Sequence, residues 1–424
     1  MFKKFTILFL VLLLTISFIS CKGNRQTDES SSEELLASTV TAADETMPET
    51  THDEAVSTAS AKPPVNLPGK IAVITEPKWG DGISKLSSGI SLLQEKYGED
   101  DILHYFWPTW PDDDKQKIID EIIADEWIKV LVIADDGREI DTAVKIMREK
   151  RDDLFLIYAE HKGAQSEIAY RLDTDLSKNA IVADLVLTTD ATNAFKNFLA
   201  QAKKMGAKTL VCLTDAYGVI NANYTSDREK ECEDAGLKFA TADFPFGLCG
   251  SDTNNAVNEI FPEIYKKHGK DIVITGLEEF RLFSTSIGAK TFFASSGYYW
   301  ADVIFSSVPA INEMGAYYDP KNIAYKHEEM RKYLDENNML GRVSLYPVTL
   351  PPLFTHTAVE YGIKWMKGEV SEEADIIVLE QIMTDFITEY AKIDNAGVYL
   401  NPIKIKNTDY PNYIGFSMDH LLYK

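Results

Sequence analysis

KVLVIADDGREIDTAVKIMREKRDDLFLIYA, residues 129–159, is the stretch of sequence that decides the fold. Two short apolar runs, 129–134 and 154–159, flank a segment at 139–150 in which apolar and charged residues alternate with helical spacing. Two neighbouring parallel strands need a long crossover connection, which is usually a helix. This stretch therefore predicts a strand, a helix and a second strand of a parallel sheet.

The same alternation continues on both sides of this stretch. Before it, we expect strands at 71–75 and 102–107 and helices at 83–97 and 112–125. After it, we expect strands at 183–188, 209–213, 237–242, 271–275, 291–295 and 342–346, and helices at 191–205, 225–235, 256–268, 355–367 and 378–393. Two consecutive series of this kind predict an α/β fold of two Rossmann-like, doubly wound lobes joined by a hinge.

These elements divide the folded part of the chain into three regions. We expect residues 67–190 and about 341–370 to form an N-terminal lobe, and residues 191–340 to form a C-terminal lobe. Residues 371–424 are expected to be a C-terminal extension that ends in an irregular tail rich in Tyr, Pro and Asn. The chain has 424 residues, of which 45% are hydrophobic, so it is long enough for two packed lobes.

The beginning of the chain has the pattern of an export signal. Two lysines precede an apolar run at 5–19, and Ser20 and Cys21 follow it. The run is short for a bilayer-spanning helix, which needs about 20 residues. Because the site resembles the bacterial lipobox, we expect residues 1–21 to be a lipoprotein signal peptide and Cys21 to carry the lipid, such as palmitate. An uncleaved anchor helix is the alternative, and it also leaves the rest of the chain outside the cell.

Residues 22–66 differ in composition from everything that follows. They are rich in Ser, Thr, Ala, Asp and Glu and contain almost no aromatic residues. Such a segment cannot bury enough apolar surface to offset the entropy lost on ordering. We therefore expect a disordered, acidic, Ser/Thr-rich linker that tethers the folded lobes to the membrane.

Charge and cysteine content exclude some classes of protein. The formal net charge of −23 disfavours a nucleic acid as partner, because binding a duplex requires concentrated Lys and Arg. After Cys21, the remaining cysteines are Cys212, Cys232 and Cys249, and their spacing fits neither a zinc site nor a redox pair. An oxidising exterior permits a disulfide between Cys232 and Cys249, but the sequence does not require one.

Two short segments resemble an uncharacterised family of bacterial lipoproteins. They are QAKKMGAKT at 201–209 and AVEY at 358–361. The resemblance extends from about Pro68 to Gly368, and it implies the fold of the type I periplasmic (solute) binding proteins. The chain departs from the family at LTDAY, 213–217, so the resemblance implies a fold and a location rather than a ligand.

Residues that follow the expected strands combine aromatic rings with carboxylates. In open α/β sheets, ligands bind at the carboxyl ends of the strands. Rings stack on apolar ligand faces and carboxylates accept hydrogen bonds, which suits a neutral polar ligand such as a sugar or a heteroaromatic ring. The expected ligand-binding residues are Glu76, Lys78, Trp79, Trp107, Trp110, Asp135, Asp136, Glu160 and His161 in the first lobe and Asp215, Tyr217, Glu278 and Tyr298 in the second.

Several of these residues also have a purely structural interpretation. Trp79 and Trp107 suit packing within the lobes, and Tyr298 suits packing at the hinge. The Asp135 and Asp136 pair, followed by glycine, suits a helix cap and turn. His161 beside Glu160 suits either a binding residue or an acid and base pair.

These observations favour a binding protein over an enzyme. The sequence has no G-x-S-x-G, H-E-x-x-H, Walker or G-x-G-x-x-G motif, and we expect no cofactor and no metal. We expect an extracytoplasmic, lipid-anchored solute-binding protein that closes two lobes around a small ligand and presents it to an ABC-type permease. The alternatives are a ligand sensor without transport, an extracytoplasmic enzyme that uses cleft carboxylates, and a surface interaction protein.

Overall fold

The computed structural model describes residues 66–75, 89–108, 112–134, 140–159, 183–215, 222–244, 260, 262–264, 266–269, 271–275, 300–301, 320–336, 340–341, 343–405 and 408–424. All of these residues belong to one compact unit of the chain, residues 62–424. The expected leader and lipid site at 1–21 and the expected linker at 22–66, except residue 66, lie outside the described residues.

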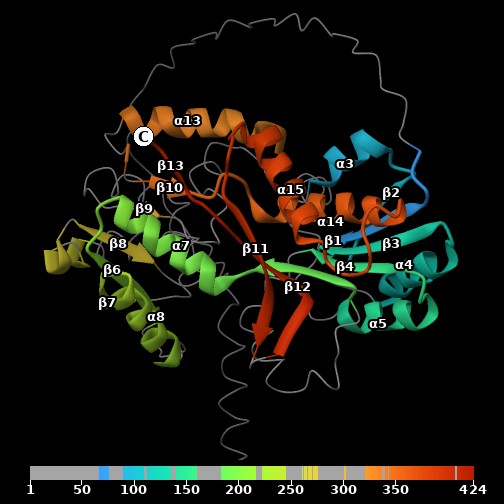
Figure 1. Cartoon of the computed structure of the whole chain (residues 1–424), viewed down its shortest axis with the longest axis horizontal. Coiled ribbons are helices and arrows are strands. Elements are labelled where there is room, and N and C mark those ends of the chain that lie inside the picture. The colour runs from blue at the N-terminus through green and yellow to red at the C-terminus, as the bar shows by residue number, and fades with distance from the viewer. Residues whose placement is uncertain are drawn as a thin grey trace, which may run out of the picture. The chain divides into compact units, whose positions relative to one another are not determined.

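A seven-stranded sheet forms the first body of the structure (Figure 1). Its order is β11-β12-β5-β4-β3-β1-β2, and every neighbouring pair is parallel except β11 and β12. The order of its first five strands, 2-1-3-4-5, is a doubly wound order with a switch point beside β1. The strands are β1 Lys70–Thr75, β2 Ile102–Phe106, β3 Ile128–Ala134, β4 Phe155–Ala159, β5 Leu185–Thr189, β11 Val398–Ile405 and β12 Thr408–Met418.

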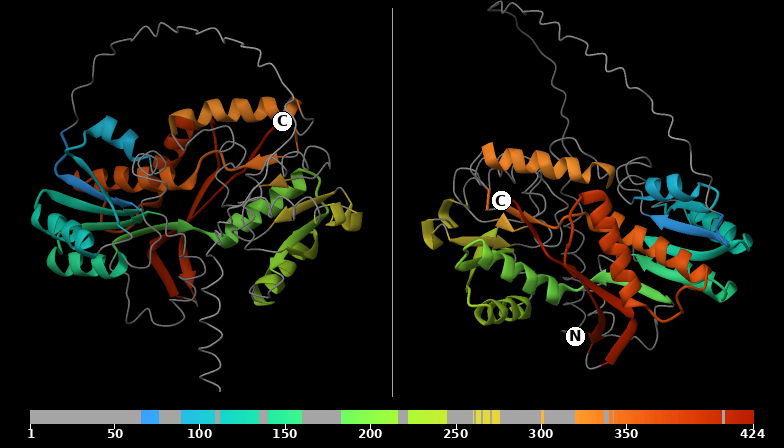
Figure 2. Two further views of the ribbon diagram at one scale, coloured as in Figure 1. Left: turned by 180° about the vertical axis from the view of Figure 1, so that it is seen from behind. Right: turned by 45° about the horizontal axis from the view of Figure 1, so that its top comes forward.

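Helices cover both faces of this sheet, because alternate residues along its central strands β1, β3, β4 and β5 are apolar on both sides (Figures 1 and 2). Val130 and Val132 of β3 face α3 Ile90–Tyr97, α14 Leu350–Met366 and α15 Ile376–Phe386. Leu131 and Ile133 face the opposite core, which includes α4 Asp112–Ala124 and α5 Ile140–Lys150. Helix α14 lies close to the sheet at Gly362, where an added Cβ would be 2.7 Å from Val130 Cγ1.

The second body contains two three-stranded sheets. The parallel sheet has the order β7-β6-β8 and is formed by β6 Thr209–Asp215, β7 Lys238–Phe244 and β8 Ile272–Thr275. The other has the order β13-β10-β9 and is formed by β9 Trp300–Ala301, β10 Val343–Leu345 and β13 Leu421–Leu422. The helices of this body are α7 Ala191–Lys204, α8 Ala222–Asp234, the 3-10 helix η1 Pro320–Asn322 and α13 Ile323–Glu336.

The expected α/β class with parallel sheets is confirmed. The expected helices end close to the predicted glycines: α7 ends two residues before Gly206 (φ 87°) and α14 two residues before Gly368 (φ 71°). Both glycines have the left-handed conformation that favours glycine after a helix. The expected strand at 291–295 lies outside the described residues.

The expected C-terminal extension needs correction, because residues after 397 form strands rather than an irregular tail. β11 and β12 are part of the first sheet, and β12 pairs with β5. Pro402 obscured this in the sequence, since proline disfavours a central strand. In the structure Pro402 lies on the edge strand, where the register shifts, and both places tolerate proline.

The segment 341–370 also differs from the expectation. We expected all of it in the first lobe, but β10 pairs with β9 and β13 of the second body. The residues that follow β10 do pack on the first sheet: Tyr346, Val348 and α14 all belong to its core. The reason is that a three-residue strand gives too little pattern to show which sheet it joins.

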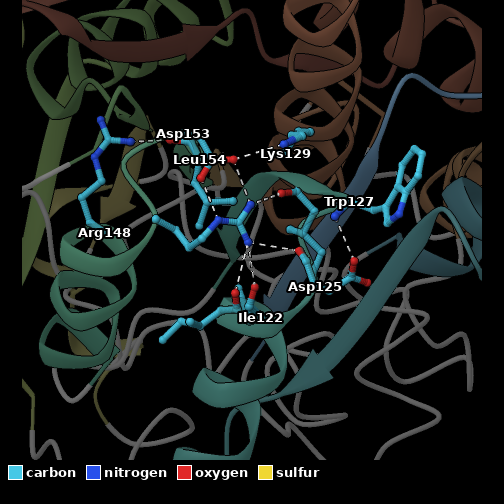
Figure 3. Close-up of polar contacts among 10 residues, drawn as sticks. Ile122, Asp125, Trp127, Lys129, Arg148, Asp153 and Leu154 are labelled. Carbon is cyan, nitrogen blue, oxygen red and sulfur yellow. Dashed lines mark hydrogen bonds and ion pairs between the residues drawn. The ribbon is translucent and has the colours of Figure 1, made fainter.

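Arg151, a buried residue between α5 and β4, binds acceptors at the amino edge of the first sheet. Figure 3 labels three of these acceptor residues, Ile122, Asp125 and Asp153. The Arg151 guanidinium donates to the carbonyl oxygens of Ile122 at 3.2 Å, Asp125 at 3.1 Å and Ile128 at 2.7 Å. It also donates to the carboxylate of Asp153 at 2.7 and 3.0 Å. The carbonyls at the end of a helix have no partner inside it, so this side chain caps α4 and joins it to β3.

Candidate functional site

In the part of the chain that the structure describes, three crossovers connect the two bodies, at Asp190, at 346–349 and at 419–420. β5 and β12 are parallel neighbours, and the first and third crossovers begin where these strands end. The second crossover leaves β10 and enters α14, whose first turn lies beside Gly89 at the start of α3. All three crossovers therefore lie at the carboxyl edge of the first sheet, which is the edge where ligands bind in this fold class.

Main-chain contacts join the first and third crossovers. The amide of Asp190 donates to the carbonyl of Phe416 at 2.7 Å. The Asp190 carboxylate accepts from the amide of Asn193 at 3.0 Å and so caps α7. In the next turn, Asn197 Nδ2 donates to the carbonyl of Met418 at 3.4 Å. The start of α7 is thus attached to the end of β12.

Aromatic rings join the third crossover to the second. The His420 ring lies 4.6 Å from the ring of Tyr346, centroid to centroid, and 6.5 Å from the ring of Phe198 in α7. His420 and Tyr346 are both buried. The three crossovers therefore share one packed junction.

The described part of the expected ligand site lies where β1 and β2 end. Thr75 Oγ1 and His104 Nε2 are 2.8 Å apart, and the His104 ring meets that of Phe106 edge to face at 4.4 Å. The amide of Trp107 donates to the carbonyl of Thr75 at 2.8 Å. These contacts fix the ends of both strands beside the switch point.

Trp107 is the expected ligand residue whose side chain the structure describes. It is 6% exposed and belongs to the core under α4 and α5, and Lys115 Nζ lies 5.9 Å from its ring centre. Its indole Nε1 is buried, and within the described structure it has no hydrogen-bond partner. An indole N–H usually finds a partner when it is buried, so the ring packs in the core while its donor stays unused.

The other expected ligand residues are not tested by the structure. Asp215 is the last residue of β6, at the carboxyl end where we expected it. The following lie outside the described residues: Glu76, Lys78, Trp79, Trp110, Asp135, Asp136, Glu160, His161, Tyr217, Glu278 and Tyr298.

A hollow of about 760 Å³ lies beside β7 in the second body. Its lining includes Asp243 and Glu263 together with Lys266, Lys267 and His268. Burial and the nearby Lys267 lower the pKa of His268. Both acidic and basic side chains line this hollow, and two of them, Lys266 and Glu263, form an ion pair at 3.7 Å. The lining therefore favours neither a cationic nor an anionic ligand.

A polar cluster that the sequence analysis missed lies between α3, α14 and the π-helical turn η2 Ile387–Ala391; of its members, Lys96 is exposed. Glu360 of α14 accepts from the Tyr97 hydroxyl through both oxygens at 2.8 Å and from Lys96 Nζ at 2.8 Å. His356, one helical turn earlier, places Nε2 3.7 Å from Glu360. Its ring packs 4.9 Å from that of Phe386. The spacing of His356 and Glu360, four residues apart in an apolar helix, was the available signal.

Burial sets the protonation of this cluster. It lowers the pKa of His356 to about 4, although Glu360 acts in the opposite direction. It also raises the pKa of Tyr97 to about 12. Burial acts to lower the pKa of Lys96, but the hydrogen bonds and charges of Glu360 and Tyr97 together outweigh burial, so the pKa is raised. At neutral pH the cluster is therefore a neutral imidazole, a neutral phenol and an ion pair, all held in one arrangement.

Two further observations concern the described residues as a group. Within these ranges, no helix has the length and apolar content needed to cross a bilayer, and no three His, Cys, Asp or Glu side chains are placed to hold a metal ion. Cys212 and Cys232 are free, buried thiols, and Cys249 lies outside the described residues.

A comparison with protein families identifies the group to which this chain belongs. The model of the family described as "Protein of unknown function (DUF3798)" matches residues 70–281, which is half of the chain. The chain is a member of the DUF3798 family. The match begins at β1, close to the predicted start of the resemblance, and includes the segment 201–209. The segment 358–361 lies beyond it. No curated protein matches the chain.

One solved structure with a TM-score above 0.5 supports the fold of this DUF3798 member. A proposed transcriptional regulator from Clostridium difficile 630 has a TM-score of 0.64 at 18% identity, covering 85% of this chain and all of that one. Two other structures have lower scores. A sugar ABC transporter from Actinomyces odontolyticus has a TM-score of 0.46 at 12% identity and covers 73% and 86% of the two chains. A solute-binding protein from Clostridium phytofermentas with bound L-rhamnose has a TM-score of 0.41 at 13% identity and covers 83% and 95%.

Proposed function

We propose that this DUF3798 protein is an extracytoplasmic, lipid-anchored receptor that captures a small polar solute between its two bodies. The observation that carries the proposal is the junction of three crossovers at the carboxyl edge of the first sheet. β10 also ends at this junction, so its carboxyl end points toward the same edge. The strand ends of the first sheet and the end of β10, beside the same crossovers, suit the capture of a ligand by closure.

The chemistry of the described edge suits a ligand with hydroxyl or carbonyl groups. The Thr75 and His104 pair offers polar atoms, and the unused N–H of Trp107 offers a donor near the end of β2. If a ligand reaches Trp107, its acceptor will satisfy that donor. The expected carboxylates and aromatic rings that follow the strands would complete the site.

Ligand screening tests this proposal. Thermal denaturation of the purified protein is measured with sugars, nucleosides, vitamins and amino acids, one class at a time. A ligand at about a hundred times its dissociation constant should stabilise the protein by roughly 2.7 kcal/mol. Failure of every class to raise the Tm, together with an empty site by native mass spectrometry of protein from its source, contradicts the proposal.

The location and partner require separate tests. We propose that Cys21 carries a lipid and that the acidic linker gives the bodies reach above the membrane. Metabolic labelling with a palmitate analogue should mark the wild-type chain, whereas Cys21→Ser should lose the label. We further propose an ABC-type permease as the partner, and ligand uptake in cells that lack this chain should fall if that is correct.

A further inference from the structure

Helix α13 is anchored to the second body through His327. His327 Nε2 lies 2.7 Å from the carbonyl oxygen of Pro347, and its Nδ1 lies 2.5 Å from the hydroxyl of Tyr423. A carbonyl oxygen can only accept, so Nε2 carries the proton and Nδ1 accepts from Tyr423. Pro347 belongs to the second crossover and Tyr423 follows β13. The middle of α13 is thus fixed beside two of the three crossovers.

The amino-terminal end of the same helical segment contacts the first body. Lys321 of η1 donates to both carboxylate oxygens of Glu95 in α3, each at 2.6 Å. Ile323, the first residue of α13, packs against the core shared by the first sheet, α3, α14 and α15. Both η1 and α13 contact η2, and Figures 1 and 2 show α13 beside the end of α15. One rigid helix therefore contacts both bodies in addition to the covalent crossovers.

The contact with the first body is suited to being broken. The side chains of Lys321 and Glu95 are 47% and 60% exposed, and an exposed ion pair of this kind contributes little. Ile323 is only partly buried. The His327 end is different, because its ring and the Tyr423 ring are buried and hydrogen-bonded. If the two bodies are pulled apart, the contact between Lys321 and Glu95 will break before the contacts of His327 with Tyr423 and Pro347.

We propose that η1 and the first turn of α13 form a latch against α3 and η2, and that this latch holds the two bodies in one mutual orientation. Rotation at the crossovers requires the latch to slide or detach, so its strength sets how often the bodies change orientation. A ligand that favours a different orientation of the bodies would have to supply enough binding free energy to offset the free energy of the latch contacts. The proposal concerns regulation of the proposed binding site and rests on a hinge movement, but its test uses no ligand.

The test measures the distance between the bodies by pulsed electron resonance. Nitroxide labels are placed at Lys150→Cys, the last residue of α5, and at Lys230→Cys on α8; both positions are exposed. The full chain is used with Cys21→Ser and Cys249→Ser. Cys212 and Cys232 stay, because burial raises their thiol pKa to about 11 and about 12 and keeps them unreactive.

Three variants are compared with the wild-type latch. Lys321→Glu faces Glu95 with a like charge. It should raise about fivefold the fraction of molecules whose label-to-label distance differs from the main wild-type distance, since coupling between sites commonly changes an equilibrium by a factor of this size. The charge swap of Lys321→Glu with Glu95→Lys should restore the wild-type distribution. Lys332→Glu is the matched control on the same helix, because Lys332 pairs with Glu336 of α13 itself at 4.0 Å. It should change nothing.

Two results would overturn the latch. One is a distance distribution for Lys321→Glu that matches wild type and the Lys332→Glu control. The other is a change that the charge swap does not reverse, because the effect would then not come from the contact with Glu95. Neither result bears on ligand binding, which the thermal-shift screen measures separately, so failure of the latch is distinguishable from failure of the proposed function.

Discussion

Acidification is expected to destabilise the first body through His356. Burial lowers the pKa of this imidazole to about 4, from 6.5 in an ordinary setting. As the pH falls, the unfolded chain takes up the proton near pH 6.5, whereas the folded chain takes it up only near pH 4. The folded state therefore loses stability across this window and keeps it above pH 6.5. At about 1.4 kcal/mol for each pH unit, the loss amounts to roughly 3 kcal/mol.

The assay is urea denaturation of wild type and His356→Gln at several pH values between 7 and 4. Glutamine is polar and does not titrate, so the variant should lose about 3 kcal/mol less than wild type over this range. Burial also lowers the pKa of His327, but His327 is present in both proteins and its effect cancels. Equal pH dependence of the unfolding free energy in the two proteins, within about 1 kcal/mol, would refute the reasoning.

Three substitutions test other parts of the structure by thermal or urea denaturation. Arg151→Met leaves several buried carbonyls and the end of α4 without a donor, and it should lower the free energy of unfolding by about 3–5 kcal/mol. The control is Lys129→Met, which removes the exposed ion pair of Lys129 with Asp153 and should cost under about 1 kcal/mol. Similar losses in the two variants would contradict the role of Arg151. Gly362→Ala brings a methyl group against Val130 and should cost about 1–3 kcal/mol, and an unchanged Tm would show that α14 shifts freely. Asp190→Ala removes the cap of α7 and should cost about 1 kcal/mol, whereas Asp190→Asn should retain most of it; equal losses would argue against capping.

The sequence predicted the first sheet well because its strands are buried on both faces. Val130 to Ile133 form a continuous apolar run, and each residue packs into one of two cores. Such runs, followed by helices that end at glycine, are visible without any knowledge of distant contacts. The pairing of β12 with β5 was not visible, since it joins residues more than two hundred positions apart, and Pro402 hid the edge strand.

The candidate site was harder to predict for the same reason. In open α/β sheets, ligands bind at the carboxyl ends of the strands. A residue such as Asp215, at the end of an expected strand, could therefore be chosen as a candidate ligand residue from the sequence alone. Whether a ring such as Trp107 faces a ligand or the core depends on helices that the local sequence does not specify. The cluster of His356 and Glu360 depends on Tyr97, which lies more than two hundred and fifty residues earlier. No local pattern contains that contact.

The segment expected to be an extension has a larger role in the hinge than its composition indicated. β12 lies between β11 and β5, so residues after 397 supply an interior strand of the first sheet. The same segment then crosses to the second body, where it adds β13 beside β10 and places His420 against Tyr346. Two crossovers alone would leave the bodies free to twist about a single line between them. A third connection, hydrogen-bonded to the first and stacked on the second, opposes twisting and leaves bending as the easier motion. Under the proposed function, bending in one direction is the motion that would close the two bodies around a ligand.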